Sequence, residues 1–120
     1  MKYMLMIYAS EAEETKMKPA DIQGLMQAYG AYTEALAKAG ALKESDRLRP
    51  STDATTVRVR GGKTEVLNGP YAETREQLGG YYVIDVPDLD AALSWAARCP
   101  TAANGTIEVR PIWPMSAPQH

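Results

Sequence analysis

Two segments of this sequence are apolar on both faces when they are read as β-strands, and this feature restricts the fold more than any other. In KYMLMIY, residues 2–8, both sets of alternate positions are apolar, and YYVIDV, residues 81–86, repeats the pattern except at Asp85. A strand of this kind must be covered on both sides. The chain has two clear helical segments, which can cover one face of a sheet. A second copy of the sheet is the simplest cover for the other face.

The two helical segments carry their own start and stop signals. The first is an amphipathic stretch that begins at Pro19 and ends at Gly40, a glycine suited to a helix C-terminus. The second begins after Asp88, a good N-cap, and stops before Pro100. Its predicted apolar face consists of Leu89, Ala92, Leu93 and Ala96.

A β-hairpin is predicted in TTVRVRGGKTEVL, residues 55–67, because Gly61-Gly62 supplies the positive φ angles of a two-residue turn. The register then places unlike charges on one face and β-branched residues on the other. Its cross-strand pairs are Arg60 with Lys63, Arg58 with Glu65 and Val57 with Val66. The segments DRLRP and STDATT before it predict a short edge strand and its turn. TIEVRPIW, residues 106–113, is the predicted last strand, with Ile107, Val109 and Trp113 on one side.

The predicted order is strand, helix, hairpin, strand, helix and strand, which is a βαββαβ pattern with room for one extra short strand. Two helices on one face of an antiparallel sheet give an α+β sandwich of the ferredoxin-like kind. A chain of 120 residues is close to the usual size of one domain. We therefore expect one domain over residues 1–113 and a flexible C-terminal tail over residues 114–120.

Composition and missing motifs exclude several classes of function. A net charge of −2 makes nucleic acid a poor partner, and the only cysteine, Cys99, and only histidine, His120, give no zinc-binding pattern. The sequence carries no phosphate-binding loop and no nucleophile elbow, so we expect neither a cofactor nor a metal. The apolar start is too short to span a bilayer and lacks a signal-peptide cleavage pattern. A cytoplasmic protein without a membrane partner is the expectation.

The stretch NGPYAETREQLGG, residues 68–80, is the most informative part of the chain. Asn68 followed by Gly69-Pro70 is good turn chemistry that needs no ligand. The polar residues after it fit one helical turn, with Glu73 and Gln77 on the same face. A solvated turn would explain them. Ordered loops longer than about 12 residues in compact domains are usually functional, however, so a site is an equal alternative.

If this loop borders a cleft, only Glu73 and Glu76 could serve there as acid or base. An arginine, from Arg47, Arg58 or Arg75, could supply the counter-charge for an anion, although solvated strand faces are the commoner role of arginine. Gly79-Gly80 would let the backbone approach another surface closely at the cleft mouth. The candidate ligand-binding residues are Asn68, Tyr71, Thr74, Arg75, Gln77, Arg47, Arg58 and Tyr81.

The start MKYMLMIY, the run GPYAETREQLGGYYVIDVPDLDAALSWAARCP and the run EVRPIW together resemble the YCII-related family, in the subgroup named after an Asp-Gly-Pro-Phe (DGPF) motif. The resemblance extends from Lys2 to about Trp113. It implies a ferredoxin-like fold that pairs through its sheets into a dimeric α/β barrel. It also implies that the activity is largely unassigned and that the gene often neighbours sigma factors of the extracytoplasmic-function type.

Two residues depart from the motif, because Asn68 stands in place of its aspartate and Tyr71 in place of its phenylalanine. An amide cannot take up a proton at neutral pH, so a general base at this position would be lost. YCII proteins proper resemble one another in a histidine and aspartate suggested as an active pair. His120 stands in the wrong place for that histidine, so no catalytic histidine is carried over.

These observations predict a small cytoplasmic homodimer that binds a small molecule, with an anion as one option, in a cleft bordered by residues 68–80. Cofactor-independent isomerase or lyase chemistry is the enzymatic version, by analogy of fold alone. The alternative is a non-enzymatic interaction or regulatory protein linked to sigma-factor-dependent transcription. A third alternative is a member that keeps the fold after losing its chemistry. A loop that lines a pocket would favour a ligand, and an exposed loop beside an apolar patch would favour a protein partner.

Overall fold

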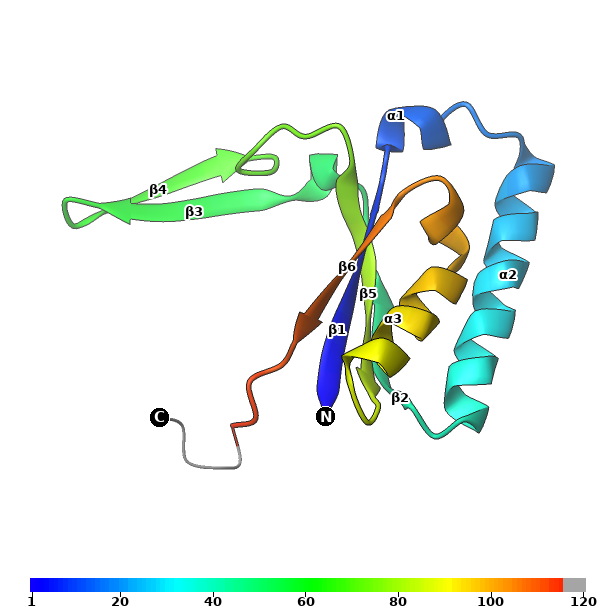
Figure 1. Cartoon of the computed structure of the whole chain (residues 1–120). Coiled ribbons are helices and arrows are strands. Elements are labelled where there is room, and N and C mark those ends of the chain that lie inside the picture. The colour runs from blue at the N-terminus through cyan, green and yellow to red at the C-terminus, as the bar shows by residue number, and fades with distance from the viewer. Residues whose placement is uncertain (116–120) are drawn as a thin grey trace.

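Strand β1 (Lys2–Ala9) lies inside a four-stranded antiparallel sheet in the computed structural model, which describes residues 1–115 (Figure 1). The strand order is β2-β5-β1-β6. The other three strands are β2 (Leu42–Arg47), β5 (Gln77–Asp85) and β6 (Thr106–Pro111). β1 therefore pairs with β5 on one side and with β6 on the other and is a central strand of the sheet.

Two helices, α2 (Pro19–Lys38) and α3 (Leu89–Arg98), lie on the same side of this sheet (Figure 1). α2 begins at the predicted proline, and Gly40 follows its end with a φ of 73°. At the start of α3 the Asp88 side chain accepts a hydrogen bond from the amide of Ala91, as an N-cap does. With β1, α2, β2, β5, α3 and β6 in this order, the chain has the predicted ferredoxin-like α+β fold.

The helices bury one set of alternate strand residues. Leu5 of β1 and Ile84 of β5 are 0% exposed, and Leu36 of α2 packs with them in the core. Met6, the neighbour of Leu5, points to the opposite side of the sheet, which no described helix covers. We call this side the open face, and its central residues are Met4, Met6, Tyr8, Tyr81 and Val83.

The hairpin of β3 (Thr55–Arg60) and β4 (Lys63–Asn68) forms as predicted, with the predicted register and with positive φ at Gly61 and Gly62. It is a separate two-stranded sheet, however, and projects from the side of the sheet opposite to the helices (Figure 1). The hairpin is thus an insertion between β2 and β5. The expected short edge strand is instead β2, which begins at Leu42 and belongs to the main sheet.

The projecting hairpin leaves apolar side chains in water. Val57, Val59 and Val66 share one of its faces and are 59%, 60% and 61% exposed. The Cα radius of gyration is 16.6 Å, against about 14 Å for a compact domain of this length. A two-stranded hairpin is marginally stable by itself in water. Its valine face is therefore a second apolar surface that this single chain does not cover.

Several predicted boundaries were wrong. β5 begins at Gln77 rather than Tyr81, so the connection after β4 is shorter than expected and contains no helical turn. β6 ends at Pro111, which leaves Trp113 exposed beyond it. A short helix, α1 (Glu11–Glu14), with Ser10 as its N-cap, occupies a stretch that the sequence suggested was a plain connection.

The apolar faces of the two helices are also less buried than expected. Leu89 and Leu93 of α3 are exposed, and so are Ile22 and Met26 in the first half of α2. Two short 3-10 helices complete the chain, η1 (Ser51–Asp53) and η2 (Pro100–Ala103). Of the tail predicted over residues 114–120, residues 116–120 lie outside the described part. Within residues 1–115, no helix combines the length and the apolar character that crossing a membrane requires.

Candidate functional site

Two cavities lie at the same end of the main sheet, on its opposite faces. The first, of about 640 Å³, is bordered by the connection between β4 and β5, and we call it the loop cleft. It reaches Tyr8 and Leu78, which pair with each other on the open-face side. The second, of about 330 Å³, lies between the sheet and the first half of α2, and we call it the helix-side pocket. The first residues of β5 lie between the two.

Hydrogen bonds within the connection give the loop cleft its shape. The amide of Gly69 donates to the carbonyl of Ala54 at 2.7 Å, which ties the end of the hairpin to its start. The Gln77 side chain donates to the carbonyl of Thr74 at 2.6 Å, and the Thr74 hydroxyl donates to the carbonyl of Glu76. These bonds fold the chain into bends in place of the predicted helical turn.

Glu11 of α1 joins this region to the rest of the chain. Its carboxylate accepts hydrogen bonds from the amide and the hydroxyl of Ser51, at 2.7 and 2.6 Å, and so caps the start of η1. Its own amide donates to the Gln77 side chain at 2.9 Å. Sequence reasoning missed this role, because Glu11 stands in a run of acidic residues typical of a solvated segment.

The loop cleft gathers four of the candidate residues from the sequence: Tyr71, Thr74, Glu76 and Gln77. The structure also brings Arg49 there, which sequence reasoning did not select. Its guanidinium forms an ion pair with Asp53 at 2.9 Å. The Tyr71 ring is 77% exposed, so the cleft of a single chain is open on that side.

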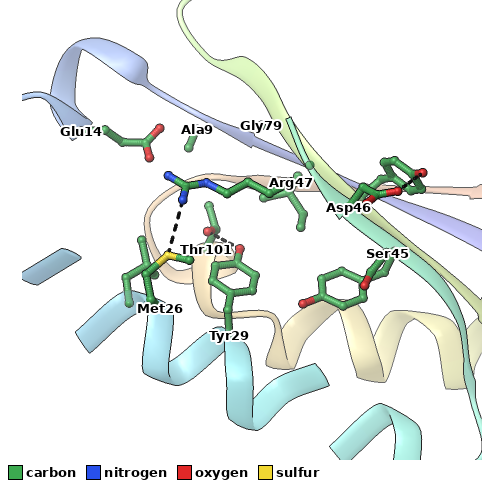
Figure 2. A pocket seen from close by; sticks show the side chains of 14 residues that line it. Ala9, Glu14, Met26, Tyr29, Ser45, Asp46, Arg47, Gly79 and Thr101 are labelled. Carbon is green, nitrogen blue, oxygen red and sulfur yellow. Dashed lines mark hydrogen bonds between the residues drawn. The ribbon is translucent and has the colours of Figure 1, made fainter. Parts of the chain in front are cut away.

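The other candidates lie elsewhere. Glu73 and Arg75 are exposed on the connection without lining the cleft. Asn68 pairs with Thr55 at the end of the hairpin, and Arg58 lies on the hairpin opposite Glu65. Arg47 and Tyr81 line the helix-side pocket instead, as Figure 2 illustrates for Arg47. Glu76 is therefore the one predicted acid or base that borders the loop cleft.

Arg47 is the most prominent charged group of the helix-side pocket. Figure 2 shows its side chain reaching from the end of β2 across the space above Met26 and Tyr29 of α2. One guanidinium nitrogen lies 3.8 Å from the Met26 sulfur. Glu14 of α1 faces it from the other side, with no ion pair between the two. Among the residues described, no carboxylate forms an ion pair with Arg47.

Hydroxyl groups line the inner part of the helix-side pocket. The Tyr29 hydroxyl is within hydrogen-bonding distance of the Thr101 hydroxyl and lies 3.5 Å from the Cys99 sulfur. The Tyr82 hydroxyl contacts that of Thr33 at 2.7 Å. Burial raises the pKa of Tyr29, of Tyr82 and of the Cys99 thiol. All three are therefore neutral at physiological pH, and Cys99 is not set up as a thiolate nucleophile.

Gly80 allows the close backbone approach that the paired glycines predicted. A Cβ atom at Gly80 would lie 2.9 Å from the carbonyl oxygen of Asp46, so β2 could not keep its place beside a larger residue. Gly79 is the bulge residue, since β1 pairs with Gly80 and then with Leu78. The bulge lies where the strand separates the two cavities.

Tyr81 belongs to the helix-side pocket through its position on β5, but its hydroxyl is engaged on the open face. It donates to carboxylate oxygens of Glu44, at 2.6 Å, and of Asp46, at 3.0 Å. These two hydrogen bonds to carboxylates, Glu44 first, raise the pKa of Tyr81. Tyr81 is thus a protonated donor that holds two acidic groups at one edge of the open face.

Within the described part of the chain, no group of three or more histidine, cysteine, aspartate or glutamate residues is placed to hold a metal ion. The loop cleft offers two carboxylates, those of Glu76 and of the Asp53 that pairs with Arg49, and two tyrosines. The helix-side pocket offers an arginine, two carboxylates and neutral hydroxyls.

Fold and cavities together define a ferredoxin-like α+β protein with a hairpin inserted before its third sheet strand and a cavity on each side of that strand. Comparison with known proteins gives the family. The YCII-related domain matches residues 1–116, so the chain belongs to the YCII-related family. It is also similar to an uncharacterized protein of Rhizobium meliloti (strain 1021), with 37% identity over 114 residues that cover 93% of this chain and 92% of that protein.

Proposed function

We propose that this protein is a cytoplasmic homodimer that pairs through the open face of its sheet and binds a small molecule in the loop cleft. One observation carries the proposal: the cleft lies at the end of the open face, with Tyr8 common to both. A second copy seated on the open face would therefore border the cleft and cover its exposed side. Membership of the DGPF subgroup belongs to the same proposal and is supported by Gly69-Pro70 at the start of the connection.

Pairing is supported by the character of the open face. Its centre is formed by methionine, tyrosine and valine side chains that no described helix covers. Methionine side chains adapt well to a partner surface. The valine face of the hairpin adds a neighbouring apolar surface on the same side of the sheet (Figure 1). A second copy would remove both surfaces from water.

Ligand binding is supported by the composition of the cleft. Tyr8 and Tyr71 provide aromatic surface, while Thr74 and Gln77 provide polar groups held by the hydrogen bonds of the connection. Glu76 is half-buried and is the carboxylate that could move a proton in isomerase or lyase chemistry. Asn68, which stands in place of the motif's aspartate, lies outside the cleft. The cleft therefore keeps the Glu76 carboxylate despite this replacement.

Sedimentation of a Met6→Glu variant tests the pairing. A carboxylate in the centre of a buried apolar surface should weaken the dimer by a factor of about 100 or more, because the charge would lose its water. Met115→Glu is the matched control, since Met115 is exposed outside the sheet. Wild-type protein that sediments only as single chains at micromolar concentration would contradict the proposal.

A thermal-shift screen of small carboxylates and lactones tests the cleft, because a ligand that binds the native state raises the melting temperature. The shift should disappear in Glu76→Gln or Tyr71→Ala and persist in Glu73→Gln, which changes a neighbouring carboxylate outside the cleft. Hits that keep their full shift in both cleft variants would contradict the assignment to this cavity.

A second candidate function is a non-enzymatic interaction protein, linked to sigma-factor-dependent transcription as the family resemblance suggests. The observation that favours it is that residues 71–75, which follow the hairpin in the chain, are exposed, as are the hairpin valines. The same loop therefore both lines a pocket, which favours a ligand, and has exposed residues next to the hairpin in the chain, which favours a protein partner. A dimer that yields no hit in the screen would favour this candidate.

A further inference from the structure

We infer that the helix-side pocket is a second binding site, which takes a small amphipathic carboxylate with Arg47 as its anion-recognition residue. The site is separate from the loop cleft and lies on the helix side of the sheet. Pairing through the open face would leave it accessible. The inference therefore depends neither on the dimer nor on a ligand in the loop cleft.

The state of Arg47 is the first reason. A guanidinium group has five N–H donors arranged to hold a carboxylate through two parallel hydrogen bonds. Within residues 1–115 its one side-chain hydrogen bond is to the Met26 sulfur at 3.8 Å, and a thioether is a weak acceptor. By contrast Arg49 and Arg110, in comparable exposed positions, each pair with a carboxylate at 2.9 Å. Arg47 is thus free to bind an anion at the mouth of a cavity.

The cavity below Arg47 gives the second reason. Its volume of about 330 Å³ is at the lower end of the range of small-molecule sites. Ile7, Leu25 and Met26 provide an apolar wall, and the hydroxyls of Tyr29 and Thr101 lie on the inner side. A ligand that fits must be short, with a compact apolar or aromatic body and an anionic end toward Arg47.

Glu14 refines the class of ligand. Figure 2 shows its carboxylate on the side of the pocket facing the Arg47 guanidinium. A plain anion on Arg47 would meet the repulsion of this second carboxylate. A carboxylate that also carries an ammonium group would instead satisfy Arg47 and Glu14 together. The arrangement therefore favours an amino acid with an apolar side chain over a simple carboxylic acid.

Three probes that share a phenyl ring separate these contributions: phenylalanine carries both charges, 3-phenylpropionate only the carboxylate, and phenethylamine only the ammonium. Binding to the full chain is measured by NMR titration or calorimetry. Phenylalanine should bind most tightly and phenethylamine most weakly. Equal affinity for phenylalanine and 3-phenylpropionate would overturn the part assigned to Glu14. Absence of binding by all three would overturn the site.

Variants locate the binding. Arg47→Met should lower the affinity for phenylalanine roughly ten- to hundredfold, the loss expected for charge-assisted hydrogen bonds. Arg47→Lys keeps the charge, so its affinity should fall less. Arg58→Met is the matched control, because Arg58 lies on the hairpin and lines neither cavity. Glu76→Gln, which tests the loop cleft, should leave phenylalanine binding unchanged. An Arg47→Met variant that folds, by circular dichroism, and binds like Arg58→Met would overturn the inference.

Discussion

The two faces of the four-stranded sheet are built from the same strands but differ in how their side chains are covered. On the covered face, Leu5 and Ile84 are fully buried, and the rings of Tyr32 and Tyr82 meet edge to face with their centroids 5.2 Å apart. On the open face, Met4 and Met6 are only partly covered by their neighbours. A single chain therefore completes one core and leaves the other side of the same sheet incomplete.

The residue types on the two faces differ accordingly. The covered face uses branched and aromatic side chains that pack against α2, and the Tyr32 hydroxyl of α2 donates to the carbonyl of Trp95 in α3 at 2.7 Å. The open face also has aromatic and branched residues, but it adds two flexible methionines at its centre and carboxylates such as Glu44 and Asp46 at its edge. Rigid packing specifies one arrangement, whereas methionine accommodates a surface that arrives later.

Replacing the neighbouring residues Leu5 and Met6 of β1 should have the largest effect on stability. The pair tests whether the two faces of the sheet differ in packing. Leu5→Ala should lower the free energy of unfolding by about 2–5 kcal/mol, because it leaves a cavity in the completed core. Met6→Ala, one residue away on the open face, should cost clearly less in dilute protein. Urea unfolding measures both. Equal losses would mean that the open face is as well packed as the covered one.

The same pair sharpens the proposal of a dimer. If a second copy covers the open face, the cost of Met6→Ala should grow with protein concentration, since only the associated state buries this side chain. The cost of Leu5→Ala should change much less with concentration.

A smaller effect is expected at the edge where β2 meets β5. Gly80→Ala should cost about 1–3 kcal/mol, because the added methyl group would lie 2.9 Å from the Asp46 carbonyl oxygen and must displace β2. Gly79→Ala is the control, as its nearest atom would be 3.9 Å away. Thermal unfolding of the two variants checks the difference. A Gly80→Ala protein as stable as Gly79→Ala would show that β2 yields easily.

The smallest expected effect is on the pH dependence of stability, and it arises from Cys99 in the completed core. Burial raises the pKa of Cys99 above that of the thiol in the unfolded chain, about 8.5. Its contribution to stability is complete below that pH and is lost as the pH rises through the folded pKa, because the unfolded chain releases the proton first. Cys99→Ala should therefore make stability fall less steeply between about pH 8 and 10. Parallel curves from urea unfolding of the two proteins would contradict this.

Much of the fold could be predicted because its signals are local. Pro19, Gly40 and Asp88 mark helix ends through backbone chemistry that needs no tertiary information. The hairpin register follows from the two glycines of its turn. The α+β class and the two-sided strands also follow from short-range patterns.

The remaining features depend on contacts distant in sequence. β2, LKESDR, has no apolar alternation, and it becomes a strand because β5 pairs with it. The register of the hairpin could be predicted but not its departure from the main sheet, which tertiary contacts decide. β5 gained four residues at its start for the same reason, since Gln77 and Leu78 pair with the end of β1.

The candidate site shows the same limit. The loop residues Tyr71, Thr74, Glu76 and Gln77 come together because they are close in sequence. Arg47 was predicted to lie near these loop residues, but β5 lies between them. Which face of the sheet a side chain occupies follows only from the strand pairing. A bulge at Gly79 shifts that pairing by one residue; the paired glycines indicated where the backbone could bend, but not the shift in register.

The insertion between β2 and β5 leaves and rejoins the sheet at a narrow neck, where the amide of Leu48 donates to the carbonyl of Gly79 at 2.9 Å and Glu11 holds Ser51 close by. A segment anchored at such a narrow neck behaves as a module. Because β3 and β4 form a sheet of their own, we expect that the hairpin can be lengthened, shortened or exchanged without altering the pairing of the four core strands. The chain is therefore a natural scaffold for grafting, in which the module can be redesigned while the core is kept.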